Sequence, residues 1–299
     1  MDVFIFQMGK VGSSAITGAL QNRGVNAVQM HWLGKETLIA TLEQSLLNVD
    51  TETPSAVRGI EEFKQNIQNT RTLYWYRKHR KRDGQKLKII TLARDPLDWY
   101  WGHLAENFDL YETEIRRWYS QVSGQAEPDV DIEKASRVFH DALFSRFGAI
   151  RRSIDHPRFD LKAAGQKFED VHTPFLPQQI MKLRLPTAWF DVFFKPEIGI
   201  DIFQKPLDRM TGMAAYDNDF AQVLLVRYEN LDVCVDAIGR FAGIDGLSLE
   251  RVNVTSRKRT AVDLPRLRSE VRPGPQALKK LYDSRYCRHF AYRPADSNA

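Results

Sequence analysis

The chain contains little cysteine and no long hydrophobic run. Two cysteines among 299 residues, Cys234 and Cys287, are too few for a disulfide framework, so we expect both thiols to be reduced. No stretch approaches the roughly 20 apolar residues that a membrane-spanning helix needs, and no group of Cys and His residues has the spacing of a zinc site. The sequence also lacks the basic start and cleavage site of a signal peptide. These absences favour a cytoplasmic protein without a transmembrane segment or a metal site.

The charge of the chain is modest and unevenly distributed. The formal net charge of +5 suits an anionic ligand but is too small to indicate nucleic-acid binding. Basic residues cluster at 77–82 and again at 257–259. Such runs are most often solvated faces. For 77–82 two interpretations stay open, a solvated face and a contact surface for an acidic polymer.

Short apolar segments alternate with helical patterns, which predicts an α/β fold with a parallel β-sheet and flanking helices. The expected strands are 3–8, 25–30, 87–93 and 222–228. The expected helices are 35–48, 56–82, 130–151, 172–185 and 275–290, with further helices beginning after loop 9–14, at Pro96 and after Asn230. We expect one domain over 1–293, with a helical and aromatic insertion at about 105–215 and a disordered tail at 294–299.

The loop at 9–14 carries the clearest chemical signal. It reads Gly9-Lys10-Val11-Gly12-Ser13-Ser14 and joins a strand to a helix, with Ser13 or Ser14 expected near the N-cap. Glycines let the backbone approach a phosphate, a helix N-terminus favours negative charge, and Lys10 adds a positive charge. In a Walker A loop the Lys follows the last Gly, whereas Lys10 precedes Gly12. The pattern predicts a phosphate loop poorly suited to ATP or GTP; the alternative is an ordinary turn with a solvated Lys10.

Two other polar features directly follow expected strands. His31 follows the strand at 25–30, and Arg94-Asp95 follows the strand at 87–93. Ligands of parallel α/β sheets bind at the carboxyl ends of the strands. We therefore expect loop 9–14, His31 and Arg94-Asp95 at one edge of the sheet.

Three segments, in order along the chain, resemble the sulfotransferases that use 3′-phosphoadenosine 5′-phosphosulfate (PAPS). Residues 7–14 resemble their 5′-phosphosulfate loop, 89–96 resemble their 3′-phosphate motif ending in Arg-Asp-Pro, and 226–231 are similar to their Tyr-Glu-Asp/Asn-Leu strand end. The resemblance implies a P-loop NTPase-like sulfotransferase fold with PAPS as co-substrate and no metal.

The second half of the chain resembles a bacterial family of capsular polysaccharide synthesis proteins. The segments that carry this likeness are 189–191, 199–203 and 281–290, and we expect the likeness to span nearly the whole chain. Together the two resemblances imply transfer of a sulfuryl group from PAPS to a hydroxyl of a glycan or surface-polysaccharide precursor. They imply neither a nucleic-acid partner nor an oligomeric state.

The sulfotransferase resemblance assigns roles to individual residues. Lys10 would hold the 5′-phosphate and the bridging oxygen, and Arg94 would hold the 3′-phosphate. The rest of the 5′-phosphosulfate loop would be Gly9, Val11, Gly12, Ser13 and Ser14. Gly102 stands where the family usually has a Ser on the 3′-phosphate, so His103 or a backbone N–H would substitute. The triplet Arg257, Lys258 and Arg259 would close the 3′-phosphate site.

Sulfuryl transfer also needs a base for the acceptor hydroxyl. His31 is the first candidate because a His at a strand end can titrate near neutral pH, although a packing role is equally open. His103 and Glu106 are the alternatives. We expect Asp95 to orient Arg94 or cap its helix.

Other residues are expected to serve structure. We expect His79 to be solvated and His289 to pack. The aromatic run 99–101 is expected to pack in a core, with a stacking platform for sugar or adenine as the alternative.

Two further functions stay open on the sequence. One is a P-loop nucleotide-dependent kinase, which the order of Lys10 and Gly12 disfavours. The other is a non-catalytic protein of polysaccharide assembly that keeps the phosphate loop, which Gly102 favours.

Overall fold

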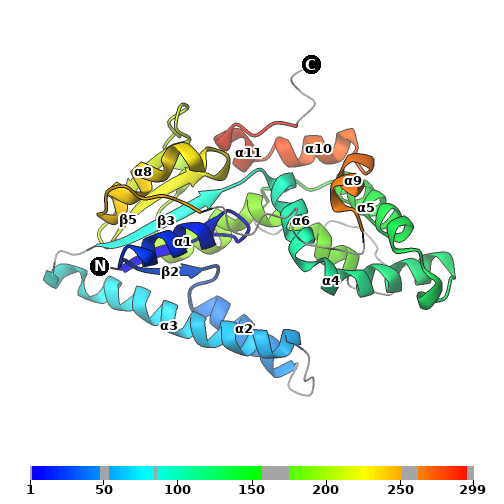
Figure 1. The fold of residues 1–299 in the computed structure, drawn as a ribbon, viewed down its shortest axis with the longest axis horizontal. Helices are drawn as coiled ribbons and strands as arrows, with labels where there is room; N and C mark the ends of the chain where they lie inside the picture. Colours follow the sequence, from blue (N-terminus) through cyan, green and yellow to red (C-terminus); the bar gives the residue numbers. More distant parts are fainter. Residues whose placement is uncertain (1, 48–53, 84–85, 157–174, 251–261, 295–299) are drawn as a thin grey trace. The chain divides into compact units, whose positions relative to one another are not determined.

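A computed structural model describes residues 2–47, 54–83, 86–156, 175–250 and 262–294 (Figure 1). The chain forms two compact units. Unit 1 comprises Met1–Ala93 and Phe190–Val252, and unit 2 comprises Arg94–Trp189 and Asn253–Ala299. The single domain over 1–293 and its insertion at about 105–215 stay predictions. Residues 295–299 of the expected tail lie outside the described residues.

Unit 1 is built on a five-stranded sheet in the order β2-β1-β3-β5-β4. Its strands are β1 (Asp2–Phe6), β2 (Asn26–Met30), β3 (Leu87–Ala93), β4 (Met213–Asp217) and β5 (Ala221–Arg227). The first four strands in spatial order are parallel, whereas β4 pairs with β5 in the antiparallel direction. The α/β class is confirmed, but the expectation of a purely parallel sheet is wrong. The sequence did not predict β4 because Met-Ala-Ala-Tyr-Asp has few of the residues that favour strands.

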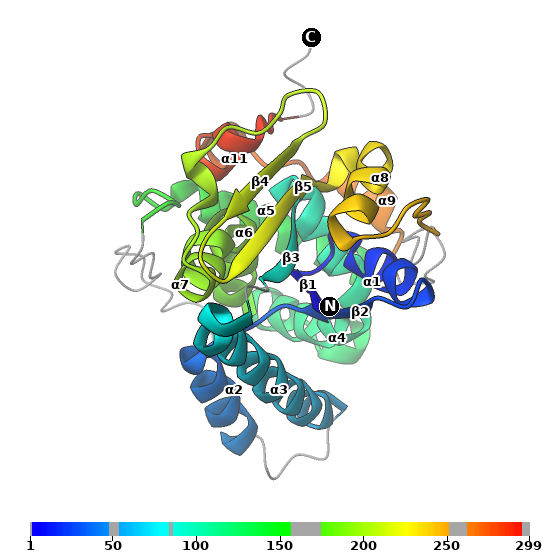
Figure 2. The same cartoon turned by 90° about the vertical axis from the view of Figure 1, so that its left-hand side faces the viewer.

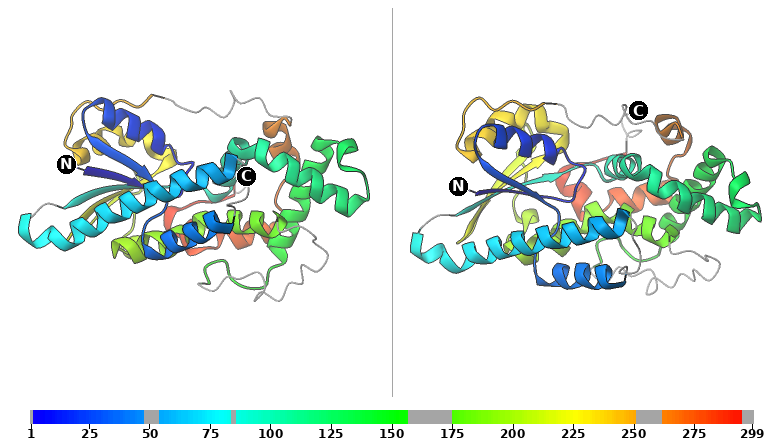
Figure 3. Two further views of the ribbon diagram at one scale, coloured as in Figure 1. Left: turned by 90° about the horizontal axis from the view of Figure 1, so that it is seen from below. Right: turned by 60° about the horizontal axis from the view of Figure 1, so that its bottom comes forward.

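Helices cover both faces of this sheet. The helices α1 (Ser13–Asn22) and α8 (Leu231–Ala242) lie on one face, and α3 (Pro54–Asp83) and α7 (Lys195–Ile198) lie on the other (Figure 2). The helix α2 (Lys35–Leu47) runs beside α3 (Figure 3). Covered faces explain why consecutive residues 3–6 of β1 are all buried.

Unit 2 is helical. Its helices are α4 (Pro96–Ser123), α5 (Ile132–Ala149), α6 (Phe175–Trp189), α9 (Leu264–Glu270), α10 (Pro275–Tyr282) and α11 (Arg285–Phe290). The prediction of one helix over 275–290 is wrong, because the Ser284 hydroxyl accepts the N–H of Cys287 and starts a new helix. The short helix α9 was not predicted.

Two expectations drawn from composition concern the state of the cysteines and membrane-spanning helices, and the described residues agree with both. Cys234 and Cys287 are free and buried. None of the helices in the described ranges is long and apolar enough to cross a bilayer.

The core of unit 2 contains a buried histidine among aromatic rings. His140 on α5 is fully buried, and its ring stacks on Trp101 at 5.2 Å between centroids. Its Nδ1 lies 2.7 Å from the carbonyl oxygen of Ser136, which can only accept, so Nδ1 carries the proton. Burial lowers the pKa of His140 to about 4. Trp99, Tyr100 and Trp101 are all buried, so the packing role expected for this run is confirmed.

The lowered pKa of His140 predicts how the stability of the protein depends on pH. The unfolded chain takes up a proton on His140 below about pH 6.5, whereas the folded protein does not until about pH 4. Lowering the pH from 7 to 5 should therefore cost about 2 kcal/mol of unfolding free energy through His140. Asp95 opposes this loss by about 1 kcal/mol, because its pKa rises to about 6 on folding.

We expect His140→Phe to remove the loss on acidification, as measured by urea unfolding at pH 7 and pH 5. The control, replacement of the exposed His156 by Gln, keeps the buried His140 and should therefore retain the loss on acidification. Equal pH dependence in wild type and His140→Phe would contradict the assignment.

Candidate functional site

The loop after β1 has a strained backbone. Gly9, Lys10 and Gly12 have φ values of +84°, +55° and +77°. Only glycine adopts such angles without cost, and for other residues the left-handed conformation costs about 1 kcal/mol. Among the described residues other than glycine, only Lys10 and Ala291 have a positive φ. Backbone strain of this kind concentrates at functional sites.

The last glycine of this loop is the N-cap of α1. Gly12 is the N-cap residue and Ser13 is the first helical residue, so the expectation that Ser13 or Ser14 lies near the N-cap is confirmed. The positive φ of Gly12 turns the chain into the helix at this point. Among the described residues, no side chain accepts a capping hydrogen bond from the N–H groups at the N-terminus of α1. Uncapped N–H groups at a helix N-terminus are suited to an anionic ligand.

Buried neighbours hold the loop in place. The Val11 side chain is fully buried and anchors the middle of the loop. A Cβ on Gly12 would lie 3.0 Å from Leu231 Cδ2 and 3.1 Å from Tyr228 Cε2. The segment Tyr228-Glu229-Asn230-Leu231, noted in the sequence without a structural role, therefore packs against the loop glycine.

His31 follows β2 and is bonded into a network with the loop. Ser14 Oγ donates to Gln29 Oε1 at 3.2 Å, and Gln29 Nε2 lies 3.4 Å from His31 Nε2. The Nδ1 atom of His31 lies 3.1 Å from the carbonyl oxygen of Gln7. The side-chain oxygen of Gln7 accepts the N–H of Gly9. Both edges of the half-buried His31 ring therefore face groups that are bonded to loop 9–14.

The contacts of His31 bear on which ring nitrogen carries a proton. The Gln7 carbonyl can only accept, so we assign a proton on Nδ1 to this contact; Nδ1 also lies 3.2 Å from the side-chain Nε2 of Gln7. The Nε2 of His31 lies 3.4 Å from the amide nitrogen of Gln29. In the neutral tautomer with its proton on Nδ1, Nε2 is the basic nitrogen, which is the form that a general base requires.

A carboxylate that the sequence did not single out lies beside the same strand end. Gly34 has a φ of +96°, and a Cβ there would overlap the Glu197 carboxylate. Burial raises the pKa of Glu197, and Arg77, whose Nη1 lies 3.6 Å from Glu197 Oε2, opposes the shift. Glu197 could not be identified from the sequence, because it is far from Gly34 along the chain and belongs to no motif.

In unit 2, the junction between Arg94 and α4 is held by two tyrosines of the C-terminal helices. The Tyr286 hydroxyl accepts the N–H of Arg94 at 3.0 Å and donates to the Arg94 carbonyl at 2.8 Å. The Tyr282 hydroxyl donates to the Asp95 carboxylate at 3.0 Å. Asp95 accepts the N–H groups of Leu97 and Asp98 and so caps α4, as expected.

The guanidinium of Arg94 lies against Gly102. A Cβ on Gly102 would lie 3.1 Å from Arg94 Nη1. A Ser at 102 would therefore require the flexible end of the Arg94 side chain to shift by a few tenths of an ångström. His103 and Glu106 are the alternative candidates for the base. His103 is hydrogen-bonded to Tyr111 Oη at 2.7 Å and stacks on Trp99, and Glu106 is exposed.

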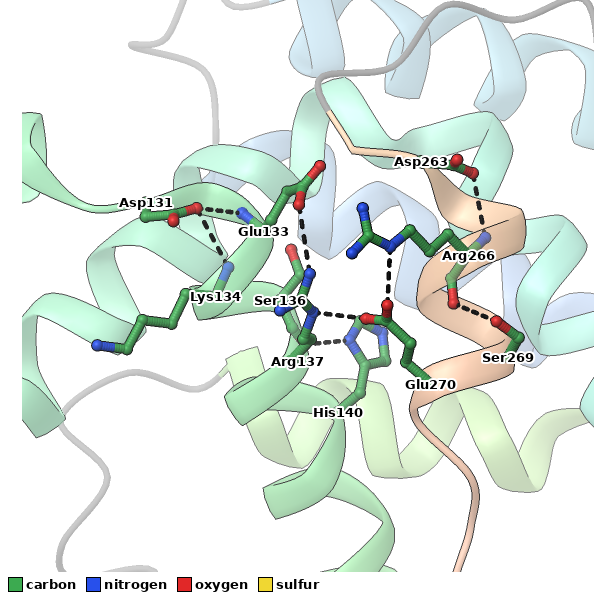
Figure 4. Close-up of polar contacts among 10 residues, drawn as sticks. All are labelled: Asp131, Glu133, Lys134, Ser136, Arg137, His140, Asp263, Arg266, Ser269 and Glu270. Atoms are coloured by element: carbon green, nitrogen blue, oxygen red, sulfur yellow. Dashed lines mark hydrogen bonds and ion pairs between the residues drawn. The ribbon is translucent and has the colours of Figure 1, made fainter.

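The triplet Arg257, Lys258 and Arg259 lies outside the described residues. The chain is described again from Val262, just before α9. An ion-pair network joins α9 to α5: Arg137 contacts Glu270 at 2.7 Å, and Glu270 also contacts Arg266 at 2.7 Å (Figure 4). This network holds the helix that follows the triplet in the sequence.

The structure brings together part of the expected site. Loop 9–14 and His31 lie at the carboxyl ends of the adjacent parallel strands β1 and β2. β3 also ends at this edge, at Ala93, where the chain passes into unit 2. Within unit 2, Arg94 and Gly102 lie together. Of the other histidines, His79 is half-buried and stacks on Trp75 at 4.8 Å, and His289 packs against Phe290 at 4.9 Å.

Comparison with known proteins finds a family match for part of the chain. Residues 160–292 are similar to a family described as "Putative capsular polysaccharide synthesis protein". The matched segment is less than half of the chain and follows both Lys10 and Arg94, so it covers less than the expected likeness. It contains Tyr228, Leu231, Tyr282 and Tyr286. No curated protein and no solved structure matches the chain.

The packing of Gly12 predicts a large effect of one methyl group. Gly12→Ala should lower the unfolding free energy by about 1–3 kcal/mol, because the added Cβ meets Tyr228 and Leu231 and the positive φ becomes strained. The matched control is Gly18→Ala in α1, where no atom lies within 4 Å of the new Cβ. It should raise stability by up to about 1 kcal/mol. Urea unfolding measures both, and equal stability of the two variants would contradict this account.

Proposed function

We propose that the protein is a sulfotransferase that transfers a sulfuryl group from PAPS to a hydroxyl of a glycan or surface-polysaccharide precursor. The observation that carries the proposal is the left-handed loop at Gly9, Lys10 and Gly12, strained at Lys10, which joins β1 to the uncapped N-terminus of α1. We propose with it the P-loop NTPase-like sulfotransferase fold. The match to capsular polysaccharide proteins over 160–292 supports a glycan acceptor.

Sulfuryl transfer requires positive charge near the leaving group. The acceptor oxygen forms a bond to sulfur while the bond from sulfur to the 5′-phosphate oxygen breaks, so negative charge develops on that oxygen. Lys10 supplies a cation, and the first N–H groups of α1 supply a favourable dipole. Arg94 would bind the 3′-phosphate through its planar guanidinium. The remaining loop residues would place their backbone against the phosphosulfate.

His31 would take the proton of the acceptor hydroxyl. With the proton of the neutral ring on Nδ1 against the Gln7 carbonyl, Nε2 would take the proton, and the acceptor hydroxyl would replace the Gln29 amide there. Glu197 on α7 lies beside Gly34, which belongs to the loop after β2 that also contains His31, and is the second candidate for this role.

The first test is calorimetric binding of 3′-phosphoadenosine 5′-phosphate, compared with ADP and with ATP plus magnesium. We expect selective binding of the 3′-phosphorylated nucleotide. Lys10→Ala and Arg94→Ala should each weaken it about 10- to 100-fold, the effect of removing a charge-assisted hydrogen bond. Lys10→Ala should also abolish sulfuryl transfer.

The control is Lys134→Ala, which removes an exposed lysine of α5 and should leave binding unchanged. Preference for ATP with magnesium would overturn the proposal in favour of a kinase. Selective binding without transfer to any acceptor would favour a non-catalytic protein of polysaccharide assembly. No binding of any of these nucleotides would refute the cofactor site.

A further inference from the structure

The helix α3 carries a strongly cationic stretch that the proposed cofactor site does not use. Between Lys64 and Arg82 the sequence contains seven Lys and Arg residues and no Asp or Glu. This part of α3 accounts for more positive charge than the net charge of the whole chain. A run of one sign on a single helix is a candidate contact surface for a polyanion.

One face of this stretch is exposed and mixes cations with aromatic rings. Ile67, Arg71, Tyr74, Trp75 and Lys78 recur at spacings of three, four and one residues, which places them on one side of the helix. All five are exposed, and Tyr74 and Trp75 are 47% and 50% accessible. The opposite side faces the protein, where Leu73 and Tyr76 are buried. We call these five residues the α3 face.

Neighbouring side chains fix the two aromatic rings. Trp75 stacks on His79 with the ring planes 27° apart, and the Nδ1 of His79 lies 2.9 Å from the Trp75 carbonyl oxygen. The guanidinium of Arg77 lies 5.2 Å from the Tyr74 ring and also pairs with Glu197. The Arg77 side chain is therefore engaged in contacts within the protein and is not counted as part of the α3 face. Because the rings are already ordered, a ligand that stacks on them loses little side-chain entropy.

We propose that the α3 face binds a linear acidic polysaccharide. The apolar C–H faces of its sugar rings would contact Trp75 and Tyr74, and its carboxylate or sulfate groups would pair with Arg71 and Lys78. These two cations are seven residues apart, about 10 Å along the helix, and the rings lie between them. An extended chain that alternates apolar sugar faces with negative groups matches this pattern.

The composition of the face favours a polymer over a membrane surface. An amphipathic helix that enters a bilayer presents a continuous apolar face, whereas cations interrupt the apolar residues of the α3 face. The choice of a polysaccharide over other polyanions rests on the proposed function. The inference deepens that function by assigning the acceptor class as acidic glycan.

The test uses the full chain and alginate oligomers, a linear polymer of uronic acids, with binding measured by calorimetry. Trp75→Ala should weaken binding at least tenfold, because it removes the stacking ring. Arg71→Ala with Lys78→Ala should weaken it at least tenfold and reduce its dependence on salt. The matched control, Lys134→Ala with Arg209→Ala, removes two exposed cations elsewhere and should change binding less than twofold.

Competing ligands complete the experiment. Uncharged dextran should not bind. Equal alginate binding by wild type and the α3 variants would overturn the inference, as would binding only to vesicles of anionic phospholipid or only to poly(dT). The α3 variants should bind 3′-phosphoadenosine 5′-phosphate as the wild type does. Failure of nucleotide binding alone refutes the sulfotransferase, and failure of alginate binding alone refutes the α3 face.

Discussion

The left-handed turn at the end of β1 is the constraint on which the candidate site depends. Gly12 is at once the end of the loop, the N-cap of α1 and the residue against which Tyr228 and Leu231 pack. The strained φ of Lys10 persists because the buried Val11 and the packed Gly12 leave the backbone little alternative. The same turn also places the N–H of Gly9 on Gln7 and so connects the loop to His31.

The part of the chain that matches the capsular polysaccharide family contains residues that pack against both candidate phosphate-binding segments. Tyr228 and Leu231 hold the loop after β1, and Tyr282 and Tyr286 hold the junction after β3. All four lie within 160–292, whereas Lys10 and Arg94 do not. The matched segment therefore includes residues that hold both candidate phosphate-binding segments in position.

The long apolar runs of the sequence predicted the strands at the centre of the sheet. Elements without such a pattern were not predicted. The apolar runs of β1, β3 and β5 are buried on both faces, so their composition alone identifies them. The edge strand β4 and the break at Ser284 depend on tertiary pairing and on one hydroxyl. The position of His31 after β2 was predictable. Its partners Gln7 and Gln29 were not, because they depend on the register of neighbouring strands and on side-chain geometry.

The hydrogen bonds between Tyr286 and Arg94 have a consequence for the order of folding. They join residues that are 192 positions apart, so they cannot form until Tyr286 has left the ribosome. Contacts of such long sequence separation slow folding, because the entropy of closing the loop is lost before the contacts form. During synthesis β3 therefore emerges long before Tyr286 exists, and the backbone of Arg94 gains these two hydrogen bonds late.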